Sequence, residues 1–221
     1  MGQNKLFSAI LAGLLAMPVH AGMLVELSAE ASLPAANDLI RATLFSELSG
    51  VQPGELAQRV NRDIAEAIKL AQSRTGIRVQ SGPQGSYPVY GQHGRIDSWR
   101  MRSEIVLESS DQAGISALIG QLQGMRLAVA GVQLLPAPET RKRVSDETIK
   151  LALQAFRARA GLIAGELGKS WRIRKINVME AGAGPQPVLH FAKVANDVAM
   201  PVEAGESQVT ASVAGEIELA D

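Results

Sequence analysis

Histidine and serine are the first residues to consider, because imidazoles bind metals and both side chains act in hydrolytic sites. Downstream of residue 21 the chain has two histidines, His93 and His190, which stand in neither an HxxxH nor an HxH spacing. A metal site would need both to converge with carboxylates, so we expect them on the surface or in loops. There is no GxSxG serine motif, and no SxxK motif at the start of an expected helix.

Two pairs of carboxylates come next, since paired acids can act as general acid and general base. Glu104 with Glu108, and Glu216 with Glu218, occupy the polar positions of segments that alternate polar and apolar residues. Such positions predict the solvated face of a strand. A hydrolase would be indicated if Glu104, Glu108 and His93 met in one cleft.

Cofactor chemistry has little support in the sequence. The absence of cysteine excludes disulfides, zinc–thiolate sites, iron–sulfur clusters and cysteine nucleophiles. No GxGxxG and no complete GxxxxGK[ST] motif occurs, since Gly168-Lys169-Ser170 has Ile163 where that motif needs its first glycine. The glycine-rich stretch 182–185 precedes no helical pattern that could complete a phosphate loop. We therefore predict no catalytic, cofactor-binding or metal-binding residues, and a protein that is not an enzyme.

The charge balance disfavours a nucleic-acid partner, because 22 Lys+Arg match 22 Asp+Glu and such binding needs a basic surface. Two basic clusters could still meet an anionic partner. Arg141-Lys142-Arg143 is expected in a solvated turn before a helix. In the second cluster, Arg172 with Arg174-Lys175, the alternation of apolar and basic residues shifts phase at Lys175, which predicts a β-bulge.

Aromatic residues supply the candidates for an interaction surface. Tyr87 and Tyr90 stand in a loop rich in Gly and Pro, and Trp99 follows downstream. Aromatic side chains in such a loop can anchor a partner, or they can fold back over the end of the sheet. The long stretch 181–206 is unusual for a compact domain, and it predicts either an extension that grips a neighbouring subunit or a mobile loop.

Periodicity predicts the elements that must position these residues. Two-residue alternation predicts strands over 24–33, 39–49, 95–109, 126–135, 170–179 and from about 207 onward, with a further strand beginning at 77. The turn from Pro34 to Asp38 suggests that the first two strands form a hairpin.

Helical periodicity predicts three helices. The first begins near Pro53 and carries an apolar stripe that includes Leu56, Val60 and Ile64, before Gly76. The second covers about 111–123 with Asp111 as its cap, and the third begins at a Ser145 cap and ends at Gly168. Alternating strands indicate antiparallel pairing, so the fold class is α+β, a mainly antiparallel sheet with three helices packed on one face.

Residues 1–21 predict a cleavable secretory signal peptide, which leaves one α+β domain over 22–221. Lys5 precedes a ten-residue apolar stretch, which Pro18 interrupts before Val19-His20-Ala21. The apolar stretch is shorter than the ~20 residues of a membrane-spanning helix. We therefore expect export to the periplasm, no stable membrane span and, since no cysteine follows, no lipid anchor.

These features together resemble the SIMPL-domain family of bacterial periplasmic proteins, which includes periplasmic immunogenic proteins. The resemblance extends over the chain after residue 21, and Asn37-Asp38 and Ser98-Trp99 depart from the residues usual in that family. It rests on the Pro34–Asp38 turn, Gly76-Ile77, Tyr87-Pro88-Val89-Tyr90, the helix LALQAFRARAGLIAGELGKS and the strand after Gly205. The resemblance implies a periplasmic α+β protein without known catalysis, linked to oxidative-stress tolerance and inclined to self-assembly.

Our leading hypothesis is therefore a non-enzymatic periplasmic protein that acts through self-assembly, as a homo-oligomer, or through binding a protein partner. The alternative is a periplasmic carrier or scavenger of a small ligand, with a pocket between the sheet and the helices.

Overall fold

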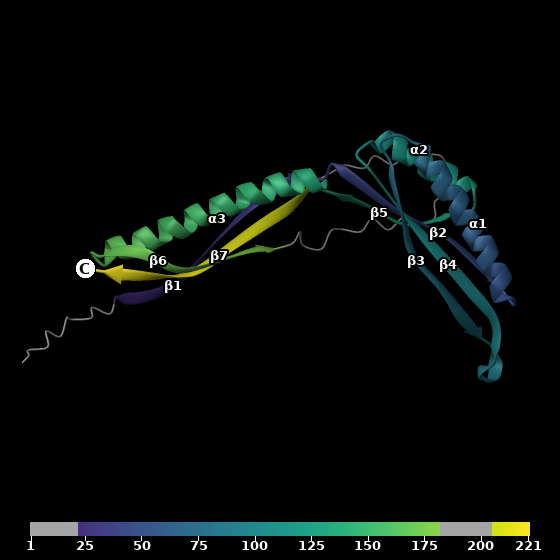
Figure 1. Ribbon diagram of the computed structural model, residues 1–221, viewed down its shortest axis with the longest axis horizontal. Helices are drawn as coiled ribbons and strands as arrows, with labels where there is room; N and C mark the ends of the chain where they lie inside the picture. Colours follow the sequence, from purple (N-terminus) through teal and green to yellow (C-terminus); the bar gives the residue numbers. More distant parts are fainter. Residues whose placement is uncertain (1–21, 182–204) are drawn as a thin grey trace, which may run out of the picture.

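The computed structural model describes residues 22–181 and 205–221, which form two layered units (Figure 1). In the first, which we call the long-helix unit, β1 (Met23–Ala36), β7 (Glu206–Ala220) and β6 (Ser170–Ala181) form an antiparallel sheet in the order β1-β7-β6. Helix α3 (Pro138–Glu166) packs on one face of this sheet.

The second, the two-helix unit, holds a four-stranded antiparallel sheet in the order β3-β4-β2-β5. Helices α1 (Pro53–Gln72) and α2 (Gln112–Gly124) cover one of its faces, and the short 3-10 turn Gln92–Gly94 joins β3 to β4. The strands are β2 (Leu39–Gly50), β3 (Arg78–Tyr90), β4 (Ile96–Ser109) and β5 (Ala128–Leu135).

Each unit has its own hydrophobic core. Apolar residues of α1 and α2, such as Val60 and Leu118, meet Leu44 and Ile105 of the four-stranded sheet. In the other unit, small residues of α3 surround the buried Phe156, against apolar residues of β1 and β7. The molecule is elongated and bent, with the helices along one side and the uncovered sheet faces along the other (Figure 1).

The α+β class and the antiparallel pairing predicted from the sequence are confirmed. The strands divide between two sheets, however, so the three helices do not share one sheet face. The predicted hairpin of the first two strands is wrong: β1 pairs with β7, whereas β2 pairs with β4 and β5. Alternation tells which side of a strand is buried but not which strand lies beside it.

Helices α1 and α2 are confirmed. The buried stripe of α1 contains Leu56, Val60 and Ile64, and the Asp111 carboxylate caps α2 by accepting a hydrogen bond from Gly114 N–H at 3.0 Å. The predicted bulge in the last basic cluster is also confirmed, because the register of β6 against β7 shifts between Ile173 and Lys175.

The predicted start of α3 at Ser145 is wrong. The helix begins seven residues earlier, at Pro138, and Ser145 is buried within it. Its first turn is held by Asp38, whose carboxylate accepts hydrogen bonds from Ala137 N–H and the Thr140 hydroxyl, both at 2.6 Å. A proline fits the first turn of a helix, and a carboxylate there complements the helix dipole.

The chain crosses between the two units twice, from β1 to β2 at Asn37 and Asp38 and from β5 to α3 at Pro136 and Ala137. Asn37 N–H donates to the Gly205 carbonyl at 3.3 Å, and the Ser207 hydroxyl donates to the Asn37 side chain at 2.6 Å. Together with the bonds of Asp38 to the start of α3, these contacts tie the first crossing to the long-helix unit.

Candidate functional site

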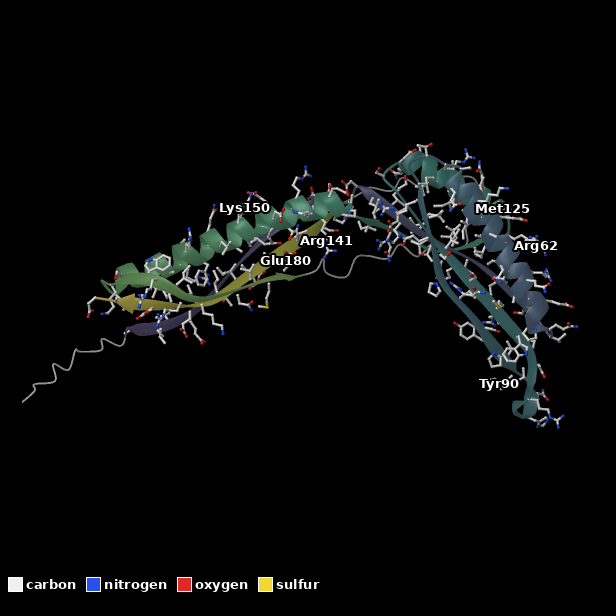
Figure 2. All side chains as sticks on the ribbon, viewed as in Figure 1. Arg62, Tyr90, Met125, Arg141, Lys150 and Glu180 are labelled. Atoms are coloured by element: carbon white, nitrogen blue, oxygen red, sulfur yellow. The ribbon has the colours of Figure 1, made fainter. Side chains whose placement is uncertain are left out.

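The predicted loop around Tyr87 and Tyr90 is wrong, because both residues lie in strand β3, which pairs with β4 in a hairpin that also contains Trp99. Only the two tyrosines are available to a partner. Tyr87 and Tyr90 are 58% and 62% exposed, whereas Trp99 is half-buried and packs against the core of the two-helix unit. Figure 2 shows Tyr90 close to the turn of the hairpin. The tyrosines could anchor a partner, and the role of Trp99 is packing.

A network of ion pairs lies on the uncovered face of the four-stranded sheet. Arg41 contacts Glu108 at 2.7 Å, and Arg78 approaches the same carboxylate at 3.7 Å. Arg102 pairs with Glu104 at 2.8 Å, and its guanidinium carbon lies 3.6 Å from the ring centroid of Phe45. Each carboxylate is therefore neutralised by arginine.

The structure does not bring Glu104, Glu108 and His93 together. His93 is exposed in the turn that precedes β4, with φ at +66°, whereas Glu108 stands near the opposite end of that strand. The ion-pair partners of Glu108 are Arg41 and Arg78, as described above. His190 lies outside the described residues. Within the part of the chain that the structure describes, no three His, Cys, Asp or Glu residues are grouped to hold a metal ion.

The second carboxylate pair lies on the uncovered face of the three-stranded sheet. Glu218 is buried, and its carboxylate contacts Arg172 at 2.7 Å and Arg174 at 3.0 Å. The bulge at Arg174 allows both guanidinium groups to reach one carboxylate. Glu216 stands opposite Lys175 in the strand register. Much of the positive charge of this basic cluster is therefore balanced within the protein.

The first basic cluster is not in a turn, as predicted, but in the first turns of α3. Residues 141–143 are exposed there, and Lys142 pairs with Asp146 at 2.7 Å. The hydrogen bond from Lys142 to that carboxylate, followed by its negative charge, raises the pKa of the lysine. The prediction missed the start of the helix because its N-cap residue, Ala137, has no capping side chain, and the stabilising carboxylate of Asp38 lies far away in the sequence.

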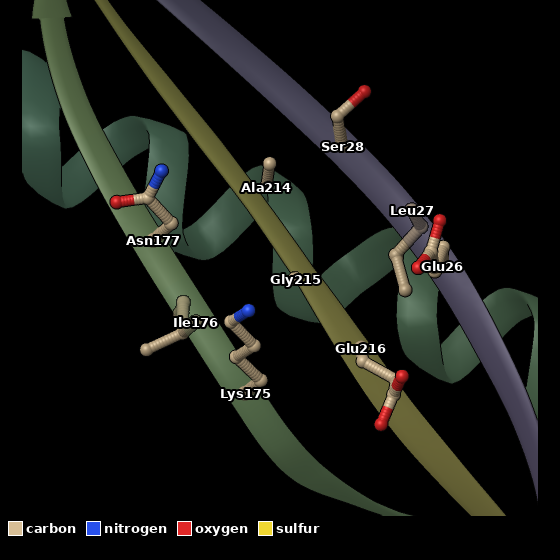
Figure 3. Close-up of a pocket in the computed structure, with 9 residues that line it drawn as sticks. All are labelled: Glu26, Leu27, Ser28, Lys175, Ile176, Asn177, Ala214, Gly215 and Glu216. Atoms are coloured by element: carbon tan, nitrogen blue, oxygen red, sulfur yellow. The ribbon is translucent and has the colours of Figure 1, made fainter.

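An open groove of about 770 Å³ crosses the three-stranded sheet (Figure 3). Strand residues alone line it, including Glu26 and Ser28 of β1, Lys175 and Asn177 of β6, and Glu216 of β7, with α3 behind the strands. This groove is therefore not the expected pocket between sheet and helices. The groove instead lies on the uncovered face, with Glu26 and Glu216 opposite each other in register.

Strand β6 is the most exposed strand of the long-helix unit. Residues 172–180 are all exposed, on both faces of the strand. Its apolar side chains share that exposure: Ile173 is 37% exposed, Ile176 and Val178 are 41% exposed, and Met179 is 52% exposed. One backbone edge of β6 pairs with β7, and among the described residues no strand lies along its other edge. Large apolar side chains beside an open strand edge are typical of a surface that pairs with another strand.

The sequence predicted β6 as a strand but did not identify it as an interaction surface. The available signal was the mixture of Ile, Val and Met with Arg and Lys, which gives neither side of the strand a fully polar character. None of the helices in the described part of the chain is long and apolar enough to span a membrane.

A family model described as "SIMPL: Protein of unknown function (DUF541)" matches residues 25–217. The chain belongs to the SIMPL family. No curated protein matches it significantly.

Two solved structures show only weak similarity. They are titled as crystal structures of AtUAH in complex with glyoxylate and with (S)-hydroxyglycine, at 13% and 15% sequence identity and TM-scores of 0.25 and 0.23. In each case the alignment covers 49% of this chain and 27% of that chain, so this chain matches about a quarter of the AtUAH length.

Proposed function

We propose that this protein acts without catalysis, by associating with further copies of itself or with a protein partner. The observation that carries the proposal is the exposure of β6, where apolar side chains lie beside an edge along which the described part of the chain places no strand. Burying such a surface against another protein removes apolar area from water and satisfies backbone groups at the same time.

The hairpin tyrosines support the same proposal. Tyr87 and Tyr90 are exposed, and tyrosine is enriched at interfaces because it supplies contact area at a low cost in conformational entropy. On the four-stranded sheet, the two carboxylates that were candidates for acid–base chemistry form ion pairs instead: Glu108 with Arg41 and Glu104 with Arg102.

Light scattering coupled to size-exclusion chromatography tests self-association. We expect the mass of the purified chain over residues 22–221 to rise above that of the monomer as its concentration increases. A mass that stays monomeric at the highest soluble concentration would contradict self-assembly and leave binding to a different protein.

A second candidate function is that of a carrier or scavenger of a small ligand. The groove on the three-stranded sheet supports this candidate. Its lining mixes carboxylates, Lys175, Asn177 and apolar atoms, a combination suited to a small polar molecule with an amine. Native mass spectrometry of protein purified from its own cells checks it: a bare protein mass would count against a retained ligand.

We propose the periplasm as the location, on the basis of the N-terminal sequence and family membership. The mass of the protein isolated from a periplasmic extract should correspond to a chain that begins at Gly22.

We also propose that the protein contributes to tolerance of oxidative stress. The test compares survival in hydrogen peroxide between a deletion strain and the same strain with the gene restored.

A further inference from the structure

We propose that two copies of this chain pair antiparallel through β6, about a two-fold axis at Asn177, to form one continuous six-stranded sheet. This inference rests on the proposed function, because it specifies which surface self-association uses and which residues face each other. It begins from a comparison of the edge strands.

Among the strands that the structure describes, β1, β6, β3 and β5 lie at sheet edges. Strand β3 contains Pro83 and Pro88 and pairs irregularly with β4, and β5 is only eight residues long. In β1, the guanidinium of Arg159 from α3 donates to the backbone carbonyl of Ser28, a group that a neighbouring strand would need. Prolines, short length and covered backbone are three of the devices that block edge pairing.

Strand β6 has none of those protections over residues 175–181. It contains no proline there, it pairs regularly with β7, and its side chains on the helix side, Ile176 and Val178, are half-exposed. Helix α3 packs mainly over β1 and β7, which leaves the helix side of β6 open to a second copy.

Symmetry restricts the register. A two-fold axis perpendicular to the sheet keeps both copies of α3 on the same side, so each residue must oppose one that points to the same face. The axis must therefore pass midway between the two copies of one residue, which lie directly opposite each other. With Asn177 on the axis, Ile176 lies opposite the partner's Val178, and Val178 opposite the partner's Ile176, which gives a cluster of four apolar side chains.

The neighbouring registers are less favourable. An axis at Val178 would place Ile176 opposite the carboxylate of the partner's Glu180, and an axis at Ile176 would place the charged Arg174 opposite the apolar Val178 of the partner. The Asn177 register instead places Arg174 opposite the partner's Glu180, which carries the opposite charge. The Asn177 register also avoids like charges, since Lys175 lies opposite the partner's Met179, and Arg172 and Arg174 are paired with Glu218.

Because the chain has no cysteine, a single introduced thiol reports the register. Directly opposed residues of antiparallel strands have Cα atoms about 4.5–5.5 Å apart, which lies inside the range of a disulfide, about 4.4–6.8 Å. We expect Asn177→Cys, oxidised at a concentration where the wild type associates, to run as a covalent dimer on a non-reducing gel.

Met179→Cys is the matched control, on the same strand and the same face. In the proposed register the two introduced thiols lie four residues apart along the strands, roughly 13 Å, too far for a disulfide. This variant should remain a monomer on the gel. Equal cross-linking of both variants would overturn the register.

Ile176→Lys tests the pairing itself, because a lysine directed into the apolar cluster is an effective block on strand pairing. We expect this variant to lose self-association while its circular dichroism spectrum stays that of the wild type. Leu24→Lys, at an exposed position on the opposite edge of the sheet, should associate as the wild type does.

These outcomes separate the inference from the proposed function. If the wild type associates but Ile176→Lys associates equally well and Asn177→Cys forms no dimer, pairing through β6 is wrong and self-association uses another surface. If the wild type is a monomer at every concentration, both this inference and self-assembly fail.

Discussion

At the scale of single residues, one contact between α3 and β7 organises the long-helix unit. Phe156 is fully buried among small residues of its own helix, and its ring reaches the position where β7 has Gly215. A Cβ atom at Gly215 would lie 3.1 Å from the ring and 2.4 Å from the backbone carbonyl of Lys175. The glycine therefore makes room chiefly for the backbone of β6 at Lys175, and also for the phenyl ring.

We predict that Phe156→Ala lowers the free energy of unfolding of the long-helix unit by about 3–5 kcal/mol, because it removes a large buried side chain and leaves a cavity. Urea denaturation followed by fluorescence measures the change. Leu162→Ala on the same helix, where the side chain is 66% exposed, is the control and should change stability by less than about 0.5 kcal/mol. A similar effect of both substitutions would contradict the assigned packing.

At the scale of elements, the start of α3 depends on a residue from the first crossing between the units. Partial burial, the largest single influence, raises the pKa of Asp38. The hydrogen bonds from Ala137 and Thr140, together with the charge of Arg143, outweigh it and hold the pKa below the ordinary value of 3.8. The ionised carboxylate is therefore favoured by folding.

We predict that Asp38→Asn lowers stability by about 0.5–1 kcal/mol at neutral pH, through loss of a charge at a helix N-terminus. Because the pKa is depressed in the folded state, this contribution is present above the ordinary value of 3.8, which holds in the unfolded chain, and disappears as the pH falls through the lower folded value. Denaturation midpoints of the wild type and the variant, measured from pH 7 to pH 3, should converge at the acid end. A constant difference across that range would rule out ionisation of Asp38 as the cause.

The elements also show how far the sequence alone could lead. The stripe on α1 and the Asp111 cap of α2 are local patterns, and both were predicted. The bulge at Arg174 was predicted because it disturbs a local alternation. The start of α3 and the strand neighbours of β1 depend on residues distant in the sequence, Asp38 and β7, and no local periodicity contains that information.

The candidate surface was only partly predicted for the same reason. The hairpin tyrosines were identified by their residue type and surroundings in the chain, and their exposure agrees with a role in binding. Trp99 is also aromatic, but it faces the core, because strand alternation places it on the helix side of β4. The open edge of β6 could not be predicted, since it follows from which strand lies beside it.

At the scale of the whole molecule, two separate cores joined by the two chain crossings imply that the units need not unfold together. The chain has two tryptophans, and each reports on one unit: Trp99 packs against the core of the two-helix unit and Trp171 against that of the long-helix unit. Single-tryptophan variants, Trp171→Phe and Trp99→Phe, therefore give separate signals from the two cores.

We predict two denaturation midpoints rather than one cooperative transition, since the tryptophans sit in cores that share no buried residue. Adding Phe156→Ala should shift the midpoint reported by Trp171 and leave that reported by Trp99 in place. Equal shifts in both signals would instead show that the units unfold as one.

Strand β7 is the central strand of its sheet and pairs with β1 along the whole length from Met23 to Ala36, although the two stand at opposite ends of the described chain. During synthesis or export, β1 and β6 must therefore wait for the last segment before their sheet can close, whereas residues 39–135 already contain every strand of the other sheet. A premature stop codon between residues 182 and 205 would leave one folded half attached to two unpaired strands, β1 and β6, and such a fragment would be a substrate for proteases and chaperones.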